Sequence, residues 1–127
     1  MKNVAIINKP MSSNCYILSQ GVDCVIVDPG TKYPIELEDY IEKNNLNPRY
    51  IILTHEHYDH IEGCNHLRII YPNVKIIASE VCSKNIQDDR WNLSRFAADN
   101  GIGFALSAAD IVIEKDIAFQ LIGFEFY

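Results

Sequence analysis

The sequence is poor in basic residues and lacks any long apolar run. It contains 11 Lys and Arg residues against 17 Asp and Glu residues, which leaves a formal net charge of −6. Non-specific binding to nucleic acid or to an anionic membrane depends on basic side chains, so this charge argues against both partners. No segment approaches the roughly 20 apolar residues that cross a bilayer. The apolar segment at residues 4–7 is too short for a signal peptide, and we expect a cytoplasmic protein.

Paired cysteines are also lacking. The four cysteines, at positions 15, 24, 64 and 82, are scattered, and none forms a C-x-x-C pair. In a chain without an export signal, this pattern indicates free, buried thiols.

Nothing in the sequence divides the chain into parts. We find no internal repeat, no low-complexity segment and no linker, and 127 residues fit one domain, 1–127. A hydrophobic content of 48% and a charged content of 22% are typical of a soluble globular protein.

The N-terminal third predicts strands followed by a helix. Segments rich in β-branched residues at 4–7, 14–19 and 24–28, separated by turn residues, indicate an antiparallel meander. A helix should begin near Pro34 and run to about Asn44, with its apolar residues at helical spacing.

The rest of the chain alternates strands with helices. Apolar strands are expected at 50–53, with both faces covered, and at 74–78, with a helix over 61–71 between them. This alternation indicates an α/β layered sheet. Further elements are expected as helices near 80–87 and 94–100, and as strands at 111–113, 118–122 and from 123 onward, with a charged turn between the first two strands.

The most informative segment is residues 54–60, which read THEHYDH and are called the histidine loop below. Three imidazoles and one carboxylate lie within six consecutive positions, directly after an apolar strand. Neutral imidazoles and carboxylates are common ligands of zinc and related divalent ions. A single histidine on an apolar face is usually a core residue, but this cluster is hard to explain by packing. It predicts metal ligation by His55, His57, Asp59 and His60.

The chemistry of such a site is hydrolytic. A bound ion lowers the pKa of a coordinated water toward neutrality. Asp59 would hold one ion and orient that water, so it is the candidate catalytic residue. Glu56 and Tyr58 alternate away from the ligands and should face solvent or pack. His66 lacks partners of this kind and should have a surface or capping role.

The histidine loop matches the H-x-H-x-D-H signature of the metallo-β-lactamase superfamily, and the chain resembles this family over roughly residues 2–127. The surrounding features occur in the same order. They are the NCY sequence at 14–16, the VDPG sequence at 27–30, Gly63 after the loop, and the NLS sequence at 92–94, which is similar to one in glyoxalase II-like hydrolases.

The resemblance implies the N-terminal half of an αββα sandwich, a partial α/β domain with a mixed sheet and helices on one face. It also implies one or two zinc ions, with iron or manganese as alternatives. His55 and His57 would belong to the first metal site, and Asp59 and His60 to the second. Asp28 either supports the loop by hydrogen bonding or begins the turn before Pro-Gly, and the sequence leaves both open.

Complete members of the family carry a further His for the first ion, a bridging Asp and a final His. None of these follows here, since the last histidine is His66. One hypothesis is therefore a hydrolase that acts on a thioester or small ester, a small-molecule substrate, by metal-activated water. The other is an inactive half-domain that only folds or self-associates. An uncovered apolar face would favour a homodimer.

Overall fold

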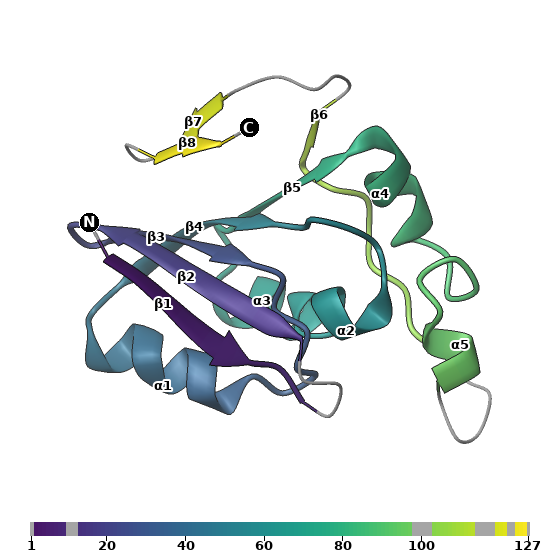
Figure 1. Ribbon diagram of the computed structural model, residues 1–127, viewed down its shortest axis with the longest axis horizontal. Helices are drawn as coiled ribbons and strands as arrows, with labels where there is room; N and C mark the ends of the chain where they lie inside the picture. Colours follow the sequence, from purple (N-terminus) through teal and green to yellow (C-terminus); the bar gives the residue numbers. More distant parts are fainter. Residues whose placement is uncertain (1, 10–12, 98–102, 114–118, 122–123, 127) are drawn as a thin grey trace.

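The computed structural model describes residues 2–9, 13–97, 103–113, 119–121 and 124–126 (Figure 1). The elements are β1 (Lys2–Ile7), β2 (Asn14–Gln20), β3 (Asp23–Val27), α1 (Ile35–Lys43), β4 (Asn47–Ile52), α2 (Tyr58–Ile61), α3 (Cys64–Ile70), β5 (Lys75–Ser79), α4 (Glu80–Asn85), α5 (Ser94–Ala97), β6 (Ile111–Ile113), β7 (Phe119–Leu121) and β8 (Phe124–Phe126). The expected charged turn between 113 and 118 lies outside the described residues.

A mixed sheet organises the fold. Its strand order is β1-β2-β3-β4-β5-β6, and β7 and β8 form a separate antiparallel pair. The first three strands are antiparallel, and β3, β4, β5 and β6 are parallel to one another. Parallel neighbours need crossover connections, and the helices between these strands supply them. The expected meander, the following α/β alternation and the mixed sheet are confirmed.

The core lies between the sheet and one layer of helices. Figure 1 shows α1, α2 and α3 on the same side of the sheet. Leu37 and Ile41 of α1, with Ile61 and Leu67 from the next two helices, join buried residues of the central strands such as Ile26 in one cluster. Helices on one face of the sheet are therefore confirmed.

The opposite face of the sheet carries an apolar row that follows the strand register. Tyr16 pairs with Val27, Val27 with Ile52, Ile52 with Ile77, and Ile77 with Ile111. Tyr16 and Ile111 are about 40% exposed, whereas Val27 and Ile52 are half-buried and Ile77 is buried. The expectation that both faces of β4 are covered is thus met fully on one face and partly on the other.

The helix expected over 61–71 is confirmed as α3 from Cys64 to Ile70, but it begins later than expected, because Ile61 belongs to the separate helix α2. The division lies at Gly63, whose N–H donates to the carbonyl of Pro29 at 2.8 Å. A Cβ at Gly63 would lie 2.6 Å from the carbonyl oxygen of Thr31. The 29–31 turn therefore packs against the chain where one continuous helix was expected, and the break follows from that tertiary contact.

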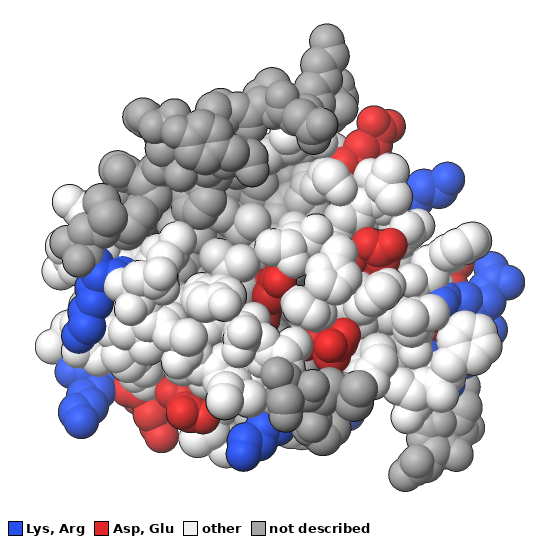
Figure 2. Space-filling view, in the orientation of Figure 1, with Lys and Arg blue, Asp and Glu red and all other residues white. Residues whose placement is uncertain are grey.

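In the orientation of Figure 2, Lys and Arg side chains lie toward the rim, and those of the described residues form no continuous basic patch on this face. Within the described part of the chain, no helix is both long enough and apolar enough to cross a membrane. All four cysteines are buried and free, as expected.

Candidate metal centre

The histidine loop begins where the parallel strands end. The N–H of Asp28, just after β3, donates to the carbonyl of Ile52 at the end of β4, and the N–H of Leu53 donates to Ile77 in β5, both at 3.0 Å. The carboxyl ends of parallel strands lie at the same edge of a sheet. Asp28 and the loop therefore meet at this edge, although 26 positions separate Asp28 from Thr54.

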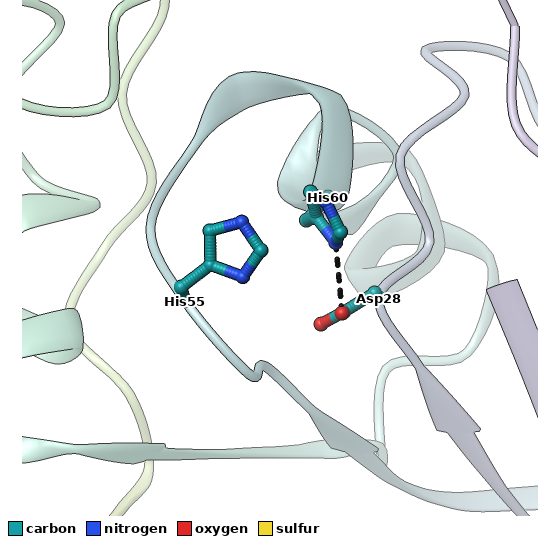
Figure 3. A group of neighbouring side chains, drawn as sticks. All are labelled: Asp28, His55 and His60. Atoms are coloured by element: carbon teal, nitrogen blue, oxygen red, sulfur yellow. Dashed lines mark hydrogen bonds and ion pairs between the residues drawn. The ribbon is translucent and has the colours of Figure 1, made fainter. Parts of the chain in front are cut away.

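Asp28 holds both ends of the histidine loop. Its side chain is buried, and Oδ1 accepts a hydrogen bond from the Thr54 N–H at 2.8 Å. Oδ2 accepts from the Thr54 hydroxyl at 2.5 Å and pairs with Nδ1 of His60 at 2.8 Å, as Figure 3 shows for His60. Of the two readings that the sequence left open, the structure shows loop support. The backbone of Asp28 has a φ of 54°, a left-handed conformation that Asp tolerates better than most residues.

These contacts determine which nitrogen of His60 is free. A carboxylate only accepts hydrogen bonds, so Nδ1 of His60 carries the hydrogen that faces Asp28. In the neutral imidazole, Nε2 then has a lone pair. Nε2 lies 3.6 Å from Oδ2 of Asp59, a second atom with lone pairs.

The same reasoning fixes His55. The only hydroxyl hydrogen of Thr54 is donated to Asp28, so the Thr54 oxygen can only accept from Nδ1 of His55, 3.0 Å away. Nε2 of His55 is then left with a lone pair. Asp28 thus sets the tautomer of two imidazoles, one directly and one through Thr54.

The structure brings two of the four predicted ligands, His55 and His60, into one group with Asp28, and leaves His57 and Asp59 outside that group. The ring centroids of His55 and His60 lie 3.9 Å apart, and those of His55 and His57 lie 4.9 Å apart. Donor atoms of Asp28, His55 and His60 all lie within 4.8 Å of one another. In Figure 3 the imidazole of His55 faces the His60–Asp28 pair across a short gap. His57 is exposed and stands at the edge of this group.

The electrostatics keep His55 available as a ligand. Burial, followed by the neighbouring His60, lowers the pKa of His55, although the carboxylates of Asp28 and Asp59 oppose this shift. A lowered pKa favours the neutral imidazole, which is the form that binds metal ions.

The other residues weighed in the sequence have packing roles. Glu56 accepts a hydrogen bond from Asn85 of α4 at 3.2 Å, and the N–H of Tyr58 donates to the carbonyl of Asn92 at 2.8 Å. His66 pairs with Glu38, which links α3 to α1. The side-chain contacts of Glu56 and His66 agree with the packing and surface roles expected for them, whereas the contact of Tyr58 is made by its backbone.

Sequence reasoning missed the residues that support the loop from outside. Thr54 belongs to the segment but received no role, and Asn8 and Ser13 were not singled out. Asn92 is fully buried, donates to Phe104 and accepts from the N–H of Ser94, so the 92–94 sequence anchors the chain beside α2. The similarity of the 92–94 sequence to a segment of known hydrolases was the one signal that pointed to a supporting residue. Nothing in the sequence around Asn8 indicated such a role.

Comparison with known proteins identifies the family. The profile described as "Metallo-beta-lactamase superfamily" matches residues 8–125. The chain is 42% identical over 78 residues to the hydroxyacylglutathione hydrolase of Buchnera aphidicola subsp. Baizongia pistaciae, which covers 58% of this chain and 30% of that protein. It is also 42% identical over 62 residues to the hydroxyacylglutathione hydrolase of Prochlorococcus marinus, covering 49% and 24%. The matched segment thus spans under a third of either relative.

Solved structures show the same fold. The BLEG-1 B3 metallo-beta-lactamase matches 98% of this chain with a TM-score of 0.86 and 24% identity, and 59% of that structure is covered. FEZ-1 from Legionella gormanii matches 88% of this chain with a TM-score of 0.71 and 15% identity, with 44% of that structure covered. The TM-scores show a shared fold. At these low identities, the likeness says nothing about a shared substrate.

Proposed function

Because the chain belongs to the metallo-beta-lactamase superfamily, we propose that it is a metal-dependent hydrolase that acts on a thioester or small ester. The observation that carries this proposal is the pair of hydrogen bonds that Asp28 accepts, from the Thr54 hydroxyl and from Nδ1 of His60, which leave the Nε2 lone pairs of His55 and His60 free. The relatives named hydroxyacylglutathione hydrolase favour the thioester, since an acyl group on the glutathione sulfur is a thioester.

The residues present fit a divalent ion. Nε2 of His60 and Oδ2 of Asp59 lie 3.6 Å apart, and both are lone-pair donors. Two such atoms repel each other unless a proton or a cation lies nearby. Imidazole nitrogen and carboxylate oxygen suit zinc first, and iron or manganese as alternatives. His55, His57, Asp59 and His60 would hold one or two ions.

The side chains of the loop then have distinct roles. A divalent ion supplies a Lewis acid that activates water and polarises the carbonyl under attack. Asp59 orients the attacking water with its carboxylate. We assign Asp28 a supporting role, because its oxygens accept three hydrogen bonds from Thr54 and His60, and these bonds keep the two imidazoles in the ligating tautomer.

A second candidate function is a half-domain without turnover. Among the described residues, the only group of three potential ligands that converges is Asp28, His55 and His60. His66, the one histidine outside the loop, pairs with Glu38 and takes no part. A site this poor in ligands favours weak metal binding and little catalysis.

Hydrolysis assays on the zinc-loaded chain separate these functions. The substrates are an acyl-glutathione thioester and a p-nitrophenyl ester, assayed with and without a chelator. Turnover that the chelator removes and that His55→Ala abolishes supports the hydrolase, with His66→Ala as the control that should keep wild-type activity. Bound zinc without turnover supports the half-domain. A chain that binds no zinc contradicts the metal centre itself.

A further inference from the structure

The carbonyl of Asp59 is held by residues that lie far from the histidine loop in the sequence. The hydroxyl of Ser13, just before β2, donates to this carbonyl at 2.5 Å across 46 positions. On another side, a Cβ on Gly30 would lie only 1.7 Å from the same oxygen, so only glycine allows this approach. The carbonyl oxygen of Asp59 is therefore held by the Ser13 hydroxyl and packs closely against the backbone of Gly30.

Asn8 connects this contact to Asp28. Its side chain is buried, at the end of β1, and its Nδ2 donates both to Oγ of Ser13 and to the carbonyl of Asp28, each at 2.9 Å. The N–H of Asn8 also donates to the carbonyl of Ser13 at 2.7 Å. Asn8 thus links the two residues that hold the loop. Ser13 holds it through the Asp59 carbonyl, and Asp28 holds it through the His60 ring.

The loop needs such support because α2 is too short to hold itself. It contains only four residues, 58–61, and His57 at its N-terminus makes no side-chain capping hydrogen bond. A single helical turn is unstable alone, since its nucleation is unfavourable. Asp59 and His60 lie on this turn, so their direction depends on contacts from outside it.

We propose that Ser13 and Asn8 are positioning residues that aim Asp59 and His60 at the metal ion. This inference rests on the metal site of the proposed function. Ser13 fixes the backbone from which both ligands project. Asn8 holds the Ser13 hydroxyl and the Asp28 carbonyl at a fixed distance from each other, because its side chain donates to both. Neither side chain touches the ion, so their effect reaches it through the ligands.

The test compares two serines whose hydroxyls make hydrogen bonds, Ser13, which is half-buried, and Ser83, which is buried. Ser13→Ala removes the hydrogen bond to Asp59, and Ser13→Thr keeps a hydroxyl. Ser83→Ala is the control, because the Ser83 hydroxyl is hydrogen-bonded as well, accepting from the N–H of Ala109 at 3.0 Å, but lies outside the histidine loop. Zinc affinity is measured by competition with a chromophoric chelator, and the melting temperature is measured without metal.

We expect Ser13→Ala to weaken zinc binding about tenfold, the lower end of effects seen for residues that support ligands. Ser13→Thr should restore most of the affinity, and Asn8→Asp, which loses the Nδ2 donor, should weaken it in the same direction. Ser83→Ala should keep wild-type affinity even where its metal-free melting temperature falls as far as that of Ser13→Ala. Equal zinc loss in both alanine variants would reveal general destabilisation and overturn the proposal.

A second measurement does not depend on metal. Amide hydrogen exchange in the metal-free chain should be faster at His60 and Glu62 in Ser13→Ala, because their N–H groups close the turn of α2, and unchanged in Ser83→Ala. Unchanged exchange, or wild-type zinc affinity in Ser13→Ala, would overturn the positioning role. If the wild-type chain binds no zinc, the proposed function fails, and exchange alone decides whether Ser13 holds the loop.

Discussion

The carboxylate of Asp28 pairs with Nδ1 of His60 at 2.8 Å, although 32 positions separate the two residues. This contact does more than close a loop. It places the imidazole hydrogen on Nδ1 and leaves Nε2 free on the side of Asp59. The tautomer of His60, a candidate ligand on α2, is therefore set by Asp28, which follows β3.

Asp28→Asn should weaken zinc binding by about 10–100-fold, the range typical for partners of metal-bound histidines. An amide can donate to Nδ1 of His60, which would place the hydrogen on Nε2, where the ion belongs. Chelator competition measures the affinity. Asp110→Asn is the control, since Asp110 also accepts a backbone N–H, from Ile76, but lies outside the loop. Wild-type affinity in Asp28→Asn would contradict the tautomer argument.

Thr54→Val should also weaken zinc binding, and Thr54→Ser should not. Valine keeps the shape of threonine but removes the hydroxyl that links Asp28 to Nδ1 of His55. The absorption of the cobalt-substituted chain gives a direct view of the ligand field. A valine variant whose cobalt spectrum and affinity match those of the serine variant would show that Thr54 does not act through His55.

Much of the scaffold was predictable because its signals are local. The β-branched segments and turn residues gave β1, β2 and β3, and helical spacing gave α1. The histidine loop was recognised from seven consecutive residues. Each of these patterns depends on neighbours in the sequence, and the structure confirms the elements they predicted.

The parts that were missed depend on contacts between distant residues. Gly63 divides the expected helix because the 29–31 turn packs against it, and nothing near Gly63 in the sequence signals that turn. Asn8 and Ser13 are ordinary polar residues beside strands, and their partners lie 20 and 46 positions away. Spacing alone does not reveal such pairs, so the sequence predicted candidate ligands but not the residues that support them.

The cysteines should be unreactive in the folded chain. Burial raises the pKa of the Cys15, Cys24 and Cys82 thiols to about 12, and raises that of Cys64 as well. A raised pKa keeps each thiol protonated at pH 8, and the protonated form is a poor nucleophile. Ellman's reagent should therefore detect almost no thiol at pH 8 without denaturant and four in guanidinium. Fast reaction of the native chain would contradict this burial.

Self-association through the apolar row stays a prediction. Tyr16 and Ile111 are exposed on the sheet face opposite the helices, where a second copy could cover them. Sedimentation velocity should detect dimers that Tyr16→Lys weakens. Ile69→Lys is the control, because Ile69 is 77% exposed but belongs to α3. A strict monomer at high concentration, or equal effects of both variants, would contradict a dimer through this face.

Gly30→Ala should disturb the histidine loop far more than Gly21→Ala. A Cβ at Gly30 would overlap the Asp59 carbonyl at 1.7 Å, so one of the two backbones must move. Gly21 has open space around it but a φ of 63°, where alanine costs about 1 kcal/mol from backbone strain alone. Thermal unfolding without metal, together with zinc affinity, distinguishes the two variants. We expect Gly21→Ala to lower only the melting temperature and Gly30→Ala to lower both quantities, because its clash acts on the peptide that carries Asp59. A Gly30→Ala chain with wild-type zinc affinity would show that the ligands do not depend on the position of that carbonyl.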